Sequence, residues 1–153
     1  LNPQPQAETP LSLSPAIVIA CSSVSGRSTG EIWMKIKAVD LPPGRPQLEG
    51  LLHGVDMGDM QGAYLTVPAG TDFCHLLEGL PNDHCQCPHW GYLIEGRIVV
   101  TYEDGAEEVV EAGEFYYWPP GHTVRMEEAT KQVEFSPRDE MNAVLDHVVT
   151  KLG

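Results

Sequence analysis

The sequence predicts an all-β domain followed by one C-terminal α-helix. From residue 31 onward, short apolar or alternating runs are separated by turns rich in glycine and proline, and strands at such spacing are typical of a β-sandwich or barrel. Asp104-Gly105 stands between two of these runs and indicates a β-hairpin, because this turn needs positive φ. Residues 137–152 instead repeat their apolar positions at helical spacing.

The predicted strands follow one another with a turn after each. Residues 32–39 alternate well enough for a half-buried strand, which Pro42-Pro43-Gly44 ends. Residues 62–67 form a second strand, which Pro68-Ala69-Gly70 closes. The remaining predicted strands are residues 92–102, 107–110, 115–118, 122–126 and 132–135.

The predicted C-terminal helix, residues 137–152, carries its own start signals. Ser136 is a good N-cap, Pro137 suits the first helical position, and Asp139 and Glu140 place negative charge in the first turn. The apolar stripe of the helix consists of Met141, Val144, Leu145, Val148 and Leu152. We expect this stripe to pack on the core or on a second subunit.

The composition indicates one domain with a different segment before it. Residues 1–29 are polar and rich in turn formers around one apolar patch at 16–20. This predicts a partly flexible N-terminal arm ahead of a domain of residues 30–153, and the arm can pack on that domain or on a neighbouring subunit. Residues 16–21 look a little like the end of a bacterial lipoprotein signal. No basic residue precedes them, so a short strand or ordered arm is the favoured interpretation.

Charge and cysteine usage restrict the partners and the compartment. The formal net charge is −13, from 22 acidic and 9 basic residues, which argues against nucleic acid and anionic membranes as partners. No apolar stretch is long enough to span a bilayer. Cys85 and Cys87 have poor geometry for a disulfide on an extended strand, and nothing demands a bond between Cys21 and Cys74. We therefore expect reduced thiols and a cytoplasmic setting.

One segment carries most of the chemical information. Residues 84–89 contain two histidines and two cysteines, namely His84, Cys85, Cys87 and His89. Thiolates and imidazoles are the ligands that borderline-soft metals prefer, and side chains two apart on a strand share a face. The sequence therefore predicts a metal site inside a small β-fold.

The reach of these side chains limits which of them can share one ion. On an unbroken strand, Cys85 and His89 would lie about 13 Å apart and could not share it, whereas Cys87 and His89, about 6.6 Å apart, could. Pro88 removes a ladder donor and favours a bend, which could bring Cys85 back within range. His84 is the alternative to Cys85 if the chain turns differently.

Residues 84–137 resemble the cupin superfamily. The second cupin motif is Gly, five residues, Pro-x-Gly, two residues, His, and residues 113–121 match its opening. The first motif is His-x-His, three or four residues, Glu, six residues, Gly; here His89 takes the glutamate position ahead of Gly96, and His84 takes that of the second histidine. The resemblance implies a cupin-like jelly-roll β-barrel that forms homodimers and binds a small-molecule ligand.

The chain departs from the cupin pattern at the expected ligands. Asn82 replaces the first histidine, and Val124 stands at the histidine position of the second motif, with His122 two residues earlier on the same strand face. The expected metal ligands are Cys85, Cys87, His89 and His122. Two thiolates and two imidazoles suit zinc, the first choice, while a nitrogen-rich set with an open position suits iron, the second.

Three kinds of function follow from such a site. The first is a metalloenzyme that acts on a small organic molecule by isomerase, lyase or dioxygenase chemistry, with a nearby Glu or Tyr moving protons. Tyr92 and Glu95 are candidates for that role, although ordinary packing and a surface carboxylate explain them as well. The second is a non-catalytic binding or sensing protein with a closed structural or redox-sensitive Cys/His site. The third is a degenerate site on a scaffold for dimerisation.

Overall fold

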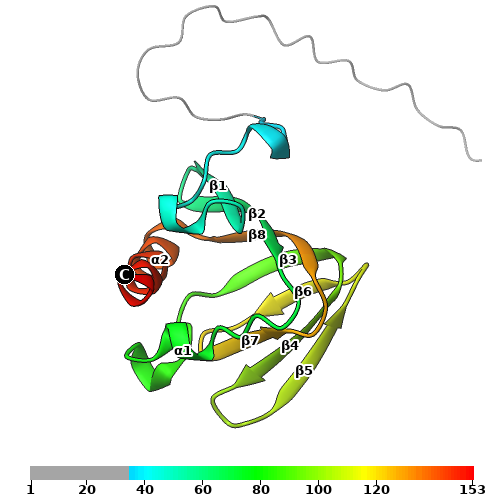
Figure 1. The fold of residues 1–153 in the computed structure, drawn as a ribbon, viewed down its shortest axis with the longest axis vertical. Helices are drawn as coiled ribbons and strands as arrows, with labels where there is room; N and C mark the ends of the chain where they lie inside the picture. The colour runs from blue at the N-terminus through cyan, green and yellow to red at the C-terminus, as the bar shows by residue number, and fades with distance from the viewer. Residues whose placement is uncertain (1–34) are drawn as a thin grey trace, which may run out of the picture. The chain divides into compact units, whose positions relative to one another are not determined.

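Two antiparallel β-sheets form most of the computed structural model, which describes residues 35–153 (Figure 1). The larger sheet has the strand order β1-β2-β8-β3-β6, and the smaller has the order β5-β4-β7. The strands are β1 (Leu52–Met57), β2 (Met60–Val67), β3 (His89–Glu95), β4 (Arg97–Tyr102), β5 (Glu107–Glu111), β6 (Phe115–Trp118), β7 (His122–Met126) and β8 (Thr130–Pro137). The predicted β jelly-roll with a C-terminal helix is confirmed.

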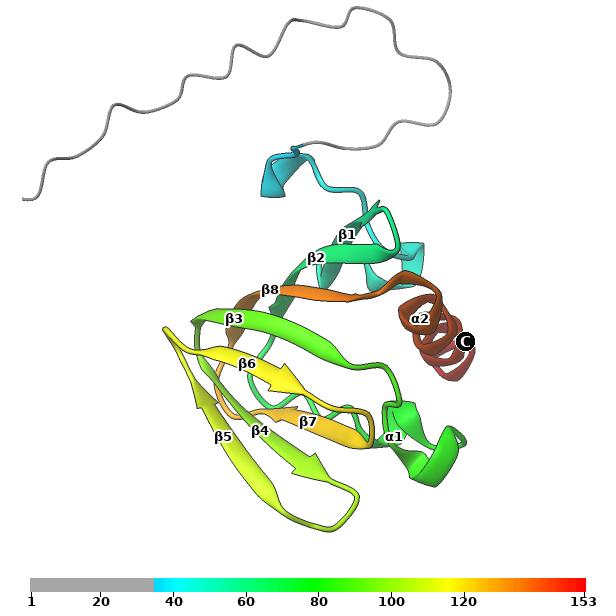
Figure 2. The ribbon, with the colours of Figure 1, turned by 180° about the vertical axis from the view of Figure 1, so that it is seen from behind.

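The helical elements are not all gathered in one place: α1 and α2 lie on the same side of the two sheets, whereas the first helical turn lies apart from them (Figures 1 and 2). They are η1 (Ala38–Asp40), η2 (Pro46–Leu48), α1 (Cys74–Leu77), η3 (Pro81–Asp83) and α2 (Arg138–Leu152). Helix α2 packs against α1, β8, β2 and η2, and it buries Met141, Leu145 and Val148. Its apolar stripe therefore faces the core. No helix within residues 35–153 is long and apolar enough to cross a membrane.

The hairpin at Asp104-Gly105 and the predicted strands 107–110, 115–118 and 122–126 are confirmed. Gly105 has a φ of 80°, and the Asp104 carboxylate accepts a hydrogen bond from the backbone N–H of Ala106 at 2.9 Å. This turn connects β4 to β5, and every residue of β5 pairs with a residue of β4. The predicted strands 115–118 and 122–126 coincide with β6 and β7. Local turn chemistry thus sets this part of the fold.

The predicted strand of residues 92–102 is wrong, because the chain forms two strands there. β3 ends at Glu95 and belongs to the larger sheet, while β4 begins at Arg97 and belongs to the smaller one. Gly96 between them has a φ of 92°, and a Cβ at this position would collide with the backbone of Ala129. Only glycine allows this corner between the sheets.

The start of the domain also differs from expectation. Residues 35–39 of the predicted first strand contain no strand and lead into η1, while residues 1–34, including the predicted arm, lie outside the described residues. The first strand within residues 35–153 is β1, which the sequence analysis missed. Gly54 interrupts its apolar pattern, yet β1 pairs with β2 from end to end. Pairing with a neighbour decides this strand rather than its own propensity.

The last strand buries polar side chains and exposes apolar ones. Thr130, Gln132, Glu134 and Ser136 are all buried, whereas Phe135 is exposed. Ser136 is part of β8, and α2 starts at Arg138 with no side-chain N-cap. The expectation that Ser136 caps the helix is therefore wrong. Its hydroxyl contacts a histidine inside the barrel instead.

Candidate metal site

Three buried side chains bring their donor atoms together between the sheets. Cys85 Sγ, one ring nitrogen of His89 and one of His122 all lie within 4.8 Å of one another. Cys85 Sγ and His89 Nε2 are 3.4 Å apart, and the two imidazole rings meet at 5.1 Å between centroids. A thiol and two imidazoles at this separation can close around one metal ion.

The backbone places Cys85 beside His122 although they are distant in sequence. The N–H of Cys85 donates to the carbonyl of His122 at 2.8 Å, and the N–H of Gly121 donates back to the carbonyl of Cys85 at 2.8 Å. The chain then bends at Cys87 before β3 begins at His89. The bend brings Cys85 within reach of His89, and a bend near Pro88 is what the sequence predicts.

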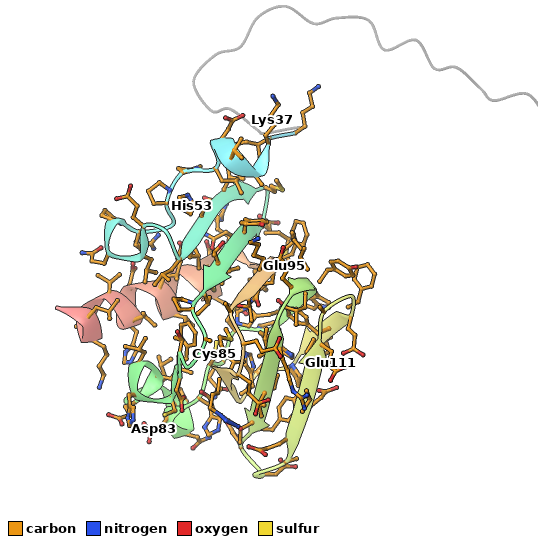
Figure 3. The ribbon with its side chains drawn as sticks, turned by 45° about the vertical axis from the view of Figure 1, so that its right-hand side comes forward. Lys37, His53, Asp83, Cys85, Glu95 and Glu111 are labelled. Carbon is orange, nitrogen blue, oxygen red and sulfur yellow. The ribbon has the colours of Figure 1, made fainter. Side chains whose placement is uncertain are left out.

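The chain enters the interior just before this bend (Figure 3). Cys85 lies near the middle of the view, whereas Asp83 lies at its lower edge. Cys85 is buried and Asp83 is exposed. Two residues of chain therefore lead from the surface to the interior.

The second ring nitrogen of His122 fixes the orientation of that imidazole. His122 Nδ1 lies 2.6 Å from the carbonyl oxygen of Pro119. Because a carbonyl only accepts hydrogen bonds, Nδ1 carries the proton and Nε2 keeps its lone pair. Metal-binding histidines characteristically donate their other N–H in this way.

His89 is held by a similar arrangement on β8. His89 Nδ1 lies 2.7 Å from Ser136 Oγ and 3.4 Å from Glu134 Oε1. These oxygens stabilise a proton on Nδ1, so Nε2 is again free to face Cys85. A carboxylate behind a histidine is the usual support of a metal ligand.

Burial controls the ionisation of all the groups here. It lowers the pKa of His89 to about 4 and that of His122 to about 4, with the charge of His89 adding to the effect at His122. It raises the pKa of Cys85 to about 12. The two imidazoles are thus neutral and ready to bind a cation, whereas the thiol loses its proton only if a cation replaces it.

The other predicted site residues lie elsewhere. Cys87 is buried, and its Sγ lies 3.6 Å from the carbonyl of Pro88, outside the group of three. His84 is half-buried and also outside that group. Glu95 is exposed and pairs with Lys131 at 2.9 Å, and Tyr92 packs against Phe115. Neither Glu95 nor Tyr92 lines the pocket that Cys85, His89 and His122 share.

Glu134 is a site residue that the sequence analysis missed. It is buried, lines the cavity beside His89, and accepts a hydrogen bond from Tyr116 Oη at 3.0 Å. Burial raises the pKa of Glu134 to about 7, against the opposing hydrogen bond from Tyr116. The sequence signal for Glu134 is the alternation in β8, where every second residue is polar: Thr130, Gln132, Glu134 and Ser136. Read as an ordinary strand, that face would point to solvent.

A family model described as "Cupin domain" matches residues 66–135, a segment that includes Cys85, His89, His122 and Glu134. No curated protein is similar to the chain in sequence.

Solved structures with similar folds include three bacterial proteins. An RmlC-like cupin from Shewanella frigidimarina is 16% identical over 69% of this chain and 91% of its own, with a TM-score of 0.47. A cupin 2 conserved barrel domain protein from Salinispora arenicola is 17% identical over 80% and 99%, with a TM-score of 0.45. Salicylate 1,2-dioxygenase from Pseudoaminobacter salicylatoxidans is 17% identical over 57% and 24%, with a TM-score of 0.43.

Proposed function

The chain belongs to the cupin superfamily, and on that premise we propose that it binds one metal ion and acts on a small organic molecule inside its barrel. The observation that carries this proposal is the convergence of Cys85, His89 and His122 at the wall of an internal cavity. Three protein donors leave at least one coordination position open. Catalytic metal sites have such a position, whereas structural sites are closed by four ligands. The open position favours an enzyme over a closed sensing or structural site.

The residues around the proposed ion have separable roles. A metal held here would supply Lewis-acid or redox chemistry to the ligand, as isomerase, lyase or dioxygenase reactions require. Ser136 and the Pro119 carbonyl orient the two imidazoles. Glu134 can accept or return a proton inside the cavity, and Tyr116 holds its carboxylate in place. This pair replaces Tyr92 and Glu95 as the candidate for proton transfer.

The metal expected first is zinc, with iron second. One thiolate and two imidazoles provide the mixed sulfur and nitrogen set that zinc accepts, and two imidazoles with an open position also suit iron. The predicted role of Cys87 as a further ligand would complete a set of four.

The unfolding temperature of the protein is expected to rise by about 5–10 °C when the metal is present at roughly 100 times its Kd.

Elemental analysis of reduced, untagged protein tests the proposal. We expect close to one equivalent of metal per chain, and iron would point to oxygen chemistry. Co²⁺-substituted protein should show thiolate charge-transfer absorption, and its d–d bands should change when azide is added, because azide fills the open position. A chain that binds no metal after reconstitution would contradict the proposal, and bands insensitive to azide would favour a closed structural site.

We propose in addition that the protein works in the cytoplasm with its thiols reduced. Cys74, Cys85 and Cys87 are free cysteines within the described part of the chain. A reduced Cys85 is required for the proposed site. Residues 1–29 remain proposed as an N-terminal arm of the domain.

An exposed aromatic surface on the outer face of the larger sheet supports a homodimer. Trp90 stacks on Tyr117 and Tyr92 packs against Phe115, with centroids 5.1 and 4.7 Å apart, and Phe135 pairs with Trp90 across the strands. The exposed fractions are 85% for Phe115, 51% for Tyr117, 42% for Trp90 and 41% for Phe135. These four side chains expose roughly 400 Å² in total.

This area fits a second copy of the chain. A stable interface buries about 800 Å² per partner, and more than half of that is apolar. The exposed aromatic surface supplies close to this apolar share, and apolar patches of this size are often functional. We therefore propose that two copies pack through this face.

Phe115→Glu is expected to convert the dimer into a monomer, because a carboxylate would be buried in the apolar interface. Light scattering after gel filtration should show the mass halved, with unchanged circular dichroism. Val39→Glu is the matched control, since Val39 is 88% exposed and lies outside the aromatic surface. A monomeric parent, or a Phe115→Glu variant that stays dimeric, would contradict this interface. An unchanged dimer in a chain lacking residues 1–29 would exclude the arm as the link.

A further inference from the structure

The internal cavity beside the three proposed ligands has two ends of different polarity. At the metal end, the polar lining residues all come from β3, β7 and β8 except for Cys85; they are Cys85, His89, His122, Thr123, Gln132 and Glu134. At the hydrocarbon end, every lining residue that α1, α2, η2, β1 and β2 contribute is a leucine, a valine or a methionine. A molecule that fills the cavity therefore contacts polar groups at one end and hydrocarbon at the other.

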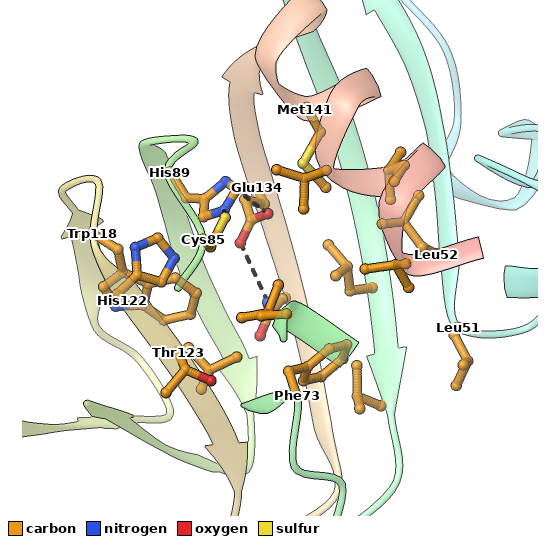
Figure 4. A pocket seen from close by; sticks show the side chains of 18 of the residues that line it. Leu51, Leu52, Phe73, Cys85, His89, Trp118, His122, Thr123, Glu134 and Met141 are labelled. Atoms are coloured by element: carbon orange, nitrogen blue, oxygen red, sulfur yellow. Dashed lines mark hydrogen bonds and ion pairs between the residues drawn. The ribbon is translucent and has the colours of Figure 1, made fainter. Parts of the chain in front are cut away.

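The order of the strands separates these two ends in space. His89 on β3 and Leu52 on β1 are three strand spacings apart in the larger sheet, which is about 14 Å along it. Figure 4 shows the same separation, with His89, Cys85 and His122 on one side of the cavity and Leu52 on the other. A ligand that reaches from one end to the other is therefore amphipathic.

The metal end offers hydrogen bonds that the described part of the chain leaves unused. Three polar atoms of the lining have no hydrogen-bond partner there: Trp118 Nε1, Thr123 Oγ1 and Gln132 Oε1. Trp118 packs against both imidazoles, and Gln132 donates to Glu134 at the same end. Trp118 and Gln132 are only 2% and 1% exposed. One donor, one acceptor and one hydroxyl favour a polar group at this end without selecting a particular one.

The size of the cavity limits the hydrocarbon part of the ligand. Its volume is about 110 Å³, whereas an apolar cavity of about 150 Å³ holds one benzene molecule. A chain of about three to five carbon atoms therefore fills the hydrocarbon end. Burial of each methylene group in such a site tightens binding about fourfold.

We propose that the ligand of this cavity is an amphipathic small molecule, with a polar head group at the metal ion and a hydrocarbon tail of about three to five carbons against α2 and β1. This inference rests on the proposed function, because the head group takes the open position of the metal ion.

Hydroxamic acids with straight alkyl tails test the inference, because their common head group binds metal ions. Titration of the Co²⁺-substituted full chain, followed through its d–d bands, gives the Kd of acetohydroxamate, butyrohydroxamate, hexanohydroxamate and octanohydroxamate. Butyrohydroxamate is expected to bind about 15-fold more tightly than acetohydroxamate, since it buries two more methylene groups. Octanohydroxamate should bind more weakly than hexanohydroxamate, because its tail exceeds the cavity.

Val144 is expected to set the length of the tail. It is half-buried on α2 and lines the hydrocarbon end. Val144→Phe should leave the Kd of acetohydroxamate near the parental value and remove the gain of butyrohydroxamate, because the larger ring occupies the space of the tail. Val149→Phe serves as the control, since Val149 is also half-buried on α2 but does not line the cavity. Unfolding temperatures of both variants close to that of the parent show that a lost gain is not lost folding.

The outcomes separate this inference from the proposed function. A chain that takes up no Co²⁺, or whose bands do not respond to acetohydroxamate, would contradict the proposed function. Acetohydroxamate binding without a gain along the series, or the full gain retained in Val144→Phe, would overturn the inference while the metal site stands. An affinity that still rises from hexanohydroxamate to octanohydroxamate would overturn the limit on tail length.

Discussion

Replacing Cys85 by serine is expected to weaken metal binding by more than about 100-fold, whereas the same replacement at Cys87 leaves it near the parental value. Changes behind the ligands already cost about 10–100-fold in affinity, and loss of a thiolate ligand should exceed that. Cys85 Sγ lies 3.4 Å from His89 Nε2. Cys87 Sγ lies outside the group of three and contacts the Pro88 carbonyl instead.

The two cysteines form a matched pair for this experiment. Both are buried, and burial raises the pKa of each thiol, so the two substitutions perturb packing and polarity in a similar way. Affinity is measured by competition with a metal-binding dye, and metal content by elemental analysis. Equal losses in the two variants would place Cys87 among the ligands, as the sequence predicts. Full metal content in Cys85→Ser would refute the proposed site.

Gly91→Ala is expected to destabilise the protein by about 2–3 kcal/mol, because a methyl group there has no space. A Cβ on Gly91 would collide with the ring and hydroxyl of Tyr116. Tyr116 is buried, stacks on Trp118 with a centroid separation of 4.0 Å and donates a hydrogen bond to Glu134. It therefore has nowhere to move without disturbing the wall of the cavity.

Chemical denaturation measures this change, and the unfolding temperature should fall by roughly 4–12 °C for a chain of this size. Tyr116→Phe removes the hydroxyl that the new methyl group meets. The double variant should therefore be less destabilised than the sum of the two single variants, which is a coupling between contacting residues. Gly91→Ala within about 0.5 kcal/mol of the parent would contradict the close packing of these two strands.

Local sequence signals predicted the elements that turns and periodicity define by themselves. The hairpin at Asp104-Gly105, the strands 115–118 and 122–126 and the C-terminal helix all agree with the structure. The sequence signals for the hairpin and the helix lie within a few residues, namely the positive φ of Gly105 and an apolar stripe along one helix. The strand β1 was missed because Gly54 interrupts its apolar pattern, and its pairing with the adjacent strand β2 defines it. The corner at Gly96 was missed because it depends on the backbone of Ala129, which is distant in sequence.

The sequence by itself determined which residue types are available for a metal: thiols and imidazoles in residues 84–89, and His122 after a matching turn. Only the tertiary structure decided which of them meet. Cys85 reaches His89 because the chain bends at Cys87 between them and because backbone hydrogen bonds hold Cys85 beside His122. Glu134 and Ser136 face the site because β8 pairs on both sides and turns its polar face inward. Distances between donors depend on such long-range pairing, which spacing along the chain does not encode.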